Sequence, residues 1–68
     1  MKQRVEIEVG QWADGSEKWG AVIHYWGDGF DYQGCSDAFG RKDTEEGARA
    51  NAMRILDEDY GKDGWGHV

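Results

Sequence analysis

The chain has 68 residues and a net charge of −6, with four tryptophans, no proline and one cysteine. A chain of this length forms one small domain, and its lack of clustered Lys and Arg argues against direct binding to DNA or RNA phosphates. It contains no apolar run of about 18 residues and no signal-peptide core, so we expect a soluble, cytoplasmic protein without a membrane partner.

Because Cys35 is the only cysteine, no disulfide within the chain can stabilise the fold. A lone cysteine also favours a reducing, intracellular setting. Four tryptophans, three tyrosines and two phenylalanines must therefore supply much of the core. Association into a homodimer is a further way to bury these side chains.

Residues 3–9 alternate strictly between apolar and polar side chains. This period of two predicts a strand with one face in the core and the other in water. The expected core positions are Val5, Ile7 and Val9, and the expected outer positions are Arg4, Glu6 and Glu8. Residues 10–18 are predicted to form a connection with a turn at Asp14-Gly15, from which Trp12 either folds back over an edge of the core or stands exposed.

The segment from Lys18 to Cys35 is predicted to form a β-hairpin. Residues 18–26 are rich in aromatic and β-branched side chains, which favour strands. Gly27-Asp28-Gly29 supplies the turn, since glycine adopts the positive φ angles that tight hairpins need. A third strand is expected over residues 30–35, with Phe30 and Tyr32 on the core face.

Residues 36–42 are expected to turn the chain toward a helix, with a strand end around Ala38-Phe39. Asp43 is the predicted N-cap of this helix, with Glu46 as its capping-box partner. The helix is expected to stop at Gly61. One of its faces collects the apolar positions Ala48, Ala52, Ile55 and Leu56.

These elements predict an α+β fold, in which a three-stranded antiparallel meander carries one helix on one face, in the order strand, strand, strand, helix. Residues 1–68 form the single domain, and residues 61–68 are its tail. Trp65 in this tail is expected either to dock on the open face of the sheet or to stay in a flexible contact segment.

No pattern of catalytic, cofactor-binding or metal-binding residues is present. His24, Cys35 and His67 lack zinc-ligand spacing, and a Cys35–His24 nucleophile pair has no recognisable orienting group. The acidic run 57–59 does not match a calcium loop, and the glycines do not form a phosphate-binding loop. The sequence therefore predicts a protein that is not an enzyme and needs no cofactor.

The outer face of the predicted sheet combines large apolar side chains with carboxylates. Exposed aromatic residues anchor interfaces, and a rim of carboxylates steers toward a basic partner. We therefore predict a protein-binding patch on this face. The alternative is a second small core, closed by Trp65 or Trp12. The candidate partner-binding residues are Glu6, Glu8, Val22, His24, Trp26, Asp31 and Gln33.

Residues 24–56 resemble HicB-type antitoxin domains. The resemblance rests on Gly34-Cys35 after a strand pair, on the helix start at residues 44–48 (Thr-Glu-Glu-Gly-Ala), and on Asn51-Ala52. The Pro-Gly-Cys element of that family is absent, because this chain has no proline. The resemblance implies a strand-to-helix arrangement and an antitoxin that neutralises a small ribonuclease.

By size, charge and lack of catalytic motifs, the chain is also similar to phage anti-defence proteins, including anti-CRISPR proteins. We therefore expect a small, acidic, non-catalytic inhibitor of phage or mobile-element type. It would block a basic nucleic-acid-binding surface of a host protein, and would not bind nucleic acid itself. The HicB-like antitoxin is the alternative function.

Overall fold

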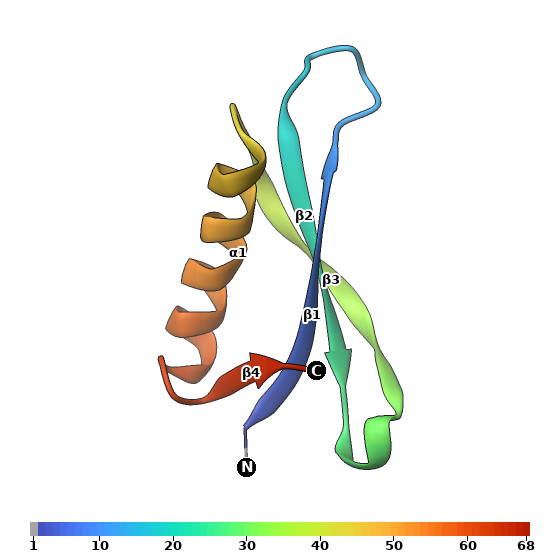
Figure 1. Cartoon of the computed structure of the whole chain (residues 1–68), viewed down its shortest axis with the longest axis vertical. Coiled ribbons are helices and arrows are strands. Elements are labelled where there is room, and N and C mark those ends of the chain that lie inside the picture. Colours follow the sequence, from blue (N-terminus) through green and yellow to red (C-terminus); the bar gives the residue numbers. More distant parts are fainter. Residues whose placement is uncertain (1) are drawn as a thin grey trace.

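The structure is a computed structural model that describes residues 2–68, and the side chains of all of these except Asp28 and residues 37–39. It confirms the α+β class. In chain order the elements are β1 (Gln3–Gln11), β2 (Trp19–Trp26), a 3-10 turn (Asp28–Phe30), β3 (Tyr32–Lys42), α1 (Glu45–Tyr60) and β4 (Trp65–His67) (Figure 1).

The sheet has four strands in the order β3-β2-β1-β4, and it is mixed. β1, β2 and β3 pair antiparallel, as the predicted meander requires, but β4 pairs parallel to β1. The prediction of a three-stranded antiparallel sheet was therefore wrong. The tail joins the sheet because the Gln3 amide donates to the Gly64 carbonyl at 2.9 Å, and the Val68 amide donates to the Val5 carbonyl at 2.9 Å.

Helix α1 packs on one face of the sheet, and the core lies between the two layers (Figure 1). Small alanine side chains on the helix allow this close approach. The predicted helix face is confirmed, since Ala48, Ala52 and Leu56 are buried and Ile55 is partly buried. The core cluster consists of Val5, Ile7, Ala21, Ile23, Ala52, Leu56 and Trp65.

Trp65 docks on the helix side of the sheet, so both of its predicted placements were wrong. Its side chain is 9% exposed, and its Nε1 donates to Asp57 Oδ1 of α1 at 2.8 Å. A buried tryptophan needs a partner for its N–H, and the last turn of the helix supplies one here. The indole of Trp65 therefore closes the helix-side core and leaves the opposite face of the sheet open.

The N-cap of α1 is Thr44, one residue later than predicted. The Thr44 hydroxyl accepts the Gly47 amide at 3.0 Å, which satisfies one of the free N–H groups of the first turn. The predicted cap, Asp43, instead forms an ion pair with Lys18 at the start of β2. At the other end, Gly61 stops the helix as predicted, with its amide donating to the Asp57 carbonyl at 2.9 Å.

The third strand differs most from the prediction. Phe30 is 61% exposed and Tyr32 is 50% exposed, so neither joins the core. The hairpin turn is longer than expected, since Gly29 and Phe30 both have positive φ and form a 3-10 turn. A register shift between Tyr25 and Trp26 then changes which side chains share a face. Residues 36–42 are not a connection but the continuation of β3.

Candidate functional site

The sheet face opposite α1, here called the outer face, carries most of the predicted patch. Successive side chains of a strand alternate between faces, so the positions next to the buried ones point outward. In register, Glu6 lies opposite His24 and Glu8 lies opposite Val22. No helix or strand among the described residues covers this side (Figure 1). Five of the seven predicted residues share it: Glu6, Glu8, Val22, His24 and Trp26.

His24 links three strands on the outer face. Its Nε2 lies 3.3 Å from Glu8 Oε1, and its Nδ1 lies 2.9 Å from the Tyr32 hydroxyl. A carboxylate only accepts hydrogen bonds, so Nε2 carries the proton and donates to Glu8. With Nε2 protonated as the one N–H of the ring, Nδ1 accepts from the Tyr32 hydroxyl. This chain of hydrogen bonds fixes the three side chains relative to one another.

Tyr32 is a site residue that sequence reasoning placed on the wrong face. Its ring contacts the Trp26 ring edge-on at a centroid distance of 5.1 Å and the His24 ring at 5.7 Å. Loss of hydration raises the pKa of Tyr32, and the nearby Cys35 and Glu8 add to the rise. The phenol therefore stays protonated near neutral pH and can donate to His24.

Cys35 lies opposite His24 in the β2–β3 register, so it belongs to the same face. The thiol is free and exposed. Sequence reasoning noted that Cys35 and His24 sit on neighbouring strands, and the register agrees. In the structure His24 is bonded to Glu8 and Tyr32 rather than to the thiol.

The other two predicted residues lie at the hairpin end. Asp31 is exposed directly after the 3-10 turn, where its carbonyl accepts the Gly27 amide at 2.8 Å. Gln33 falls at the bulge, because Tyr25 pairs with Gly34 while Trp26 pairs with Tyr32. Its amide packs closely against Gly27, where an added Cβ would lie 2.2 Å from Nε2. Gln33 does not follow the simple alternation of faces, because the bulge interrupts the ladder between β2 and β3.

Trp12 covers the opposite end of the outer face, which the sequence allowed but did not decide. Its indole packs on Gly20, where an added Cβ would lie 2.7 Å from Trp12 Nε1. The Arg41 guanidinium lies over the ring at 4.5 Å and forms an ion pair with Asp14. A pocket of about 390 Å³ opens between this indole and the strands, and Glu8 and Val22 are among its lining residues.

The contacts of Arg41 could not be predicted from the sequence, because its partners Asp14 and Ser16 lie in a loop 25 or more residues earlier in the chain. Trp12 is thus held from both sides, by the sheet beneath it and by the cation above it. The part of the outer face from Glu8 to Trp26 stays uncovered by the described residues.

Within the described residues, no group of three or more His, Cys, Asp or Glu side chains converges in a way that could hold a metal ion. Helix α1 does not have the length and apolar content needed to cross a membrane.

Comparison of the chain with models of known protein families, with curated proteins and with solved structures finds no significant match.

Proposed function

We propose that this chain is a small, acidic, non-catalytic inhibitor of phage or mobile-element type, similar in kind to anti-CRISPR proteins. Its outer face docks on a basic nucleic-acid-binding surface of a cytoplasmic host protein and blocks it. The observation that carries the proposal is the uncovered sheet face, which the rings of Trp26 and Tyr32 share with Glu6 and Glu8; His24 links Tyr32 to Glu8.

The chemistry of this face favours a protein partner. Large aromatic side chains at an uncovered face commonly mark an interface, where they become the anchoring residues. The hydrogen bonds that His24 forms with Glu8 and Tyr32 hold these two side chains in place before binding. Such preorganisation lowers the entropy cost of association.

A basic partner also fits the pocket beside Trp12. The carboxylate of Glu8 stands at its edge, and its side chain is 69% exposed. The aliphatic stem of a partner's Lys or Arg would pack on Val22 and Trp12, while its charge would reach Glu8. The ring of Trp12 already holds one cation, since Arg41 stacks on it.

Mimicry of DNA by the whole surface is not part of the proposal. The molecule is 39 Å long, and duplex DNA of that length carries about 23 charges at one per ~1.7 Å. The chain carries a net charge of −6. The inhibitor therefore acts through a few placed carboxylates and aromatic rings at one face.

The test has two stages. A tagged chain is first used to isolate its partner from nuclease-treated host lysate, and the purified partner is then titrated with variants. Replacing Glu8 and Trp26 together by Ala should weaken binding by roughly a hundredfold, because the change removes an aromatic anchor and a carboxylate from the two ends of the uncovered part of the face. The matched control replaces Glu46 and Met53, which are exposed on α1. Unchanged binding by a folded Glu8/Trp26 variant would overturn the proposal.

A HicB-like antitoxin is the second candidate. It is favoured by the position of the matching residues, since Gly34-Cys35 lies in β3 and Thr44 caps α1 directly after that strand. The partner would then be a small basic ribonuclease. Co-expression with a toxin encoded beside this chain discriminates the two, because only the antitoxin restores growth.

A further inference from the structure

A second cleft lies between the first residues of the described chain and the β2–β3 turn, which are at the same end of the molecule (Figure 1). It has a volume of about 340 Å³. Four parts of the chain build it: the start of β1, the end of β2 with the bulge in β3, the end of α1, and the residue before β4. The described lining residues are Lys2, Gln3, Arg4, Trp26, Gly27, Gln33, Tyr60 and Gly64.

The lining of this cleft is cationic in a chain that is acidic overall. Lys2 and Arg4 both border it, and none of the described lining residues is acidic. Lys18, Arg41 and Arg54 pair with carboxylates elsewhere in the fold, whereas the cleft brings two cations without such a partner in the described part of the chain to one place. Among the described side chains, no carboxylate lies within 4.0 Å of Lys2 or Arg4. Two unneutralised cations at one cleft favour an anionic ligand.

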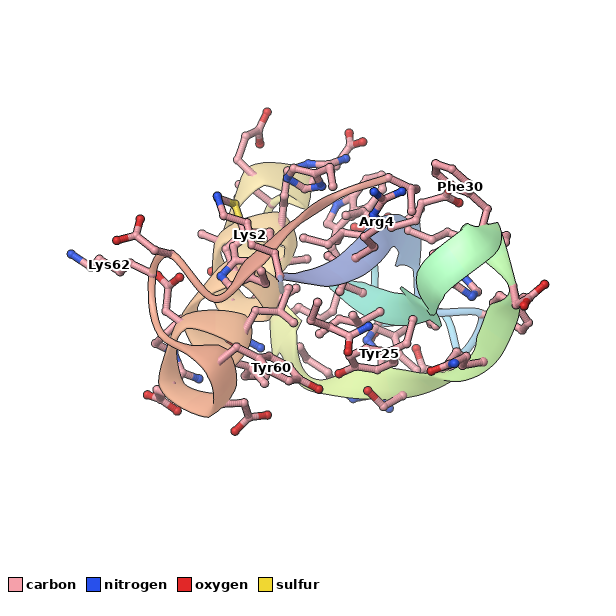
Figure 2. The ribbon with its side chains drawn as sticks, turned by 90° about the horizontal axis from the view of Figure 1, so that it is seen from below. Lys2, Arg4, Tyr25, Phe30, Tyr60 and Lys62 are labelled. Carbon is pink, nitrogen blue, oxygen red and sulfur yellow. The ribbon has the colours of Figure 1, made fainter. Side chains whose placement is uncertain are left out.

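Arg4 is held in place without losing its donors. Its guanidinium lies over the Phe30 ring at 4.5 Å, and Figure 2 shows the two side chains next to each other. A cation–π contact uses the flat face of the guanidinium and leaves its N–H groups free at the edge. Those N–H groups are arranged for bidentate bonds to a phosphate or carboxylate. The exposed Phe30, which the sequence assigned to the core, thereby gains a role.

The remaining wall offers a neutral donor and two aromatic residues. Gln33 supplies an amide, and Trp26 and Tyr60 are the aromatic residues of the described lining. Loss of hydration raises the pKa of Tyr60, with smaller contributions from Tyr25 and Asp59, so its hydroxyl brings no negative charge. Aromatic side chains of this kind stack on planar rings such as nucleobases.

We propose that this cleft binds a nucleoside monophosphate group, with the phosphate between Lys2 and Arg4 and the base against Trp26 or Tyr60. The volume lies near the lower end of ligand sites, which span roughly 300–1,000 Å³, and so suits one nucleotide. The group is either a free nucleotide or the 5′ end of a nucleic-acid strand. This site goes beyond the proposed inhibitor function: it shares Trp26 with the outer face but does not use Glu6 or Glu8.

The experiment is a titration of the ¹⁵N-labelled chain with AMP, followed by NMR. We expect saturable shifts in the backbone of Arg4, Gly27 and Gln33 and in the Trp26 indole. Replacing Lys2 and Arg4 together by Gln should weaken AMP binding by at least about tenfold, because each substitution removes a charge-assisted contact to the phosphate. Lys62→Gln is the matched control, since Lys62 lies at the same end but points away from the cleft (Figure 2).

The ligand series decides each part of the proposal. Adenosine and ribose 5-phosphate should both bind more weakly than AMP, because the first lacks the anion and the second lacks the base. The proposal would be overturned if adenosine or ribose 5-phosphate bound as tightly as AMP. It would also be overturned if Lys62→Gln weakened AMP binding as much as the double variant does, or if millimolar AMP caused no shifts. A 5′-phosphorylated trinucleotide that binds more tightly than AMP identifies a strand end as the ligand, and weaker binding identifies the free nucleotide.

The same series separates this site from the inhibitor function. The Lys2/Arg4 variant should still bind the protein partner of the outer face, because Glu6, Glu8 and His24 are unchanged. Loss of AMP binding with partner binding intact therefore tests the cleft alone.

Discussion

Gly64 shows how closely this small domain is packed at a single residue. A Cβ built there would lie 1.8 Å from the Tyr60 carbonyl oxygen. Backbone atoms cannot yield as a flexible side chain can, so Gly64→Ala should lower the free energy of unfolding by about 3 kcal/mol. Urea unfolding measures this, with Gly10→Ala as the control, because nothing lies within 4 Å of a Cβ at Gly10. Equal effects of the two changes would contradict the close approach of Gly64 to the end of α1.

Trp26 carries a buried indole N–H that has no acceptor among the described groups. An unpaired buried donor costs about 1–3 kcal/mol, whereas the ring itself contacts Tyr32 favourably. Trp26→Phe should therefore change the free energy of unfolding by less than about 1 kcal/mol, while Trp26→Ala should lower it by about 2 kcal/mol. Thermal unfolding of the two variants checks this, and a Phe variant as unstable as the Ala variant would show that the N–H is bonded.

At the scale of elements, the N-terminus of α1 is capped by the hydroxyl of Thr44. Thr44→Ala should lower the free energy of unfolding by about 1 kcal/mol, because it leaves the Gly47 amide without its acceptor. Asp43→Ala removes only an exposed ion pair with Lys18, which contributes at most about 1 kcal/mol and often far less. Urea titration ranks the two variants. A larger loss of unfolding free energy for Asp43→Ala than for Thr44→Ala would show that Asp43, as the sequence predicted, is the N-cap of α1.

The loop between β1 and β2 is tied to β3 through Asp14. The hydroxyl of Ser16 and then the Arg41 guanidinium hold the pKa of Asp14 well below its ordinary value of 3.8. A lowered folded-state pKa means that this stabilisation is complete above the unfolded value and is lost as the pH falls toward the folded one. Asp14→Asn should therefore be less stable than the wild type at pH 7, and the difference should shrink below about pH 3.8.

Urea midpoints of the wild type and Asp14→Asn at pH 7, 4 and 2 check this dependence. Asp59→Asn, which removes an exposed carboxylate from α1, is the control. A difference between wild type and Asp14→Asn that grows with acidity would contradict the Asp14–Arg41 tie.

Periodic segments of the sequence were predicted well, and contacts between distant segments were not. The alternation of residues 3–9 and the i, i+4 spacing of Ala48 and Ala52 are local patterns, so they placed β1 and α1 correctly. The three residues of β4 have no visible period, and their pairing depends on β1, more than 60 residues away. The bulge beside Tyr25 likewise depends on the register between two strands.

At the scale of the whole molecule, the candidate face was largely predictable because it follows from strand parity. Glu8 and His24 were assigned to one face, and the structure brings them within 3.3 Å. Gln33 and Tyr32 were misassigned because one bulge shifts the parity after Tyr25. The cationic cleft could not be predicted, since Lys2, Gln33 and Tyr60 meet only through the tertiary fold.

The central claim is that the outer face is the docking surface, and an NMR footprint of the purified complex tests it most directly. The account predicts that the largest shifts and line broadening on adding the partner fall on Glu6, Glu8, Val22, His24 and Trp26. It predicts little change along the exposed side of α1, such as at Glu46 and Met53. A footprint centred on α1 with the outer face unperturbed would contradict the account.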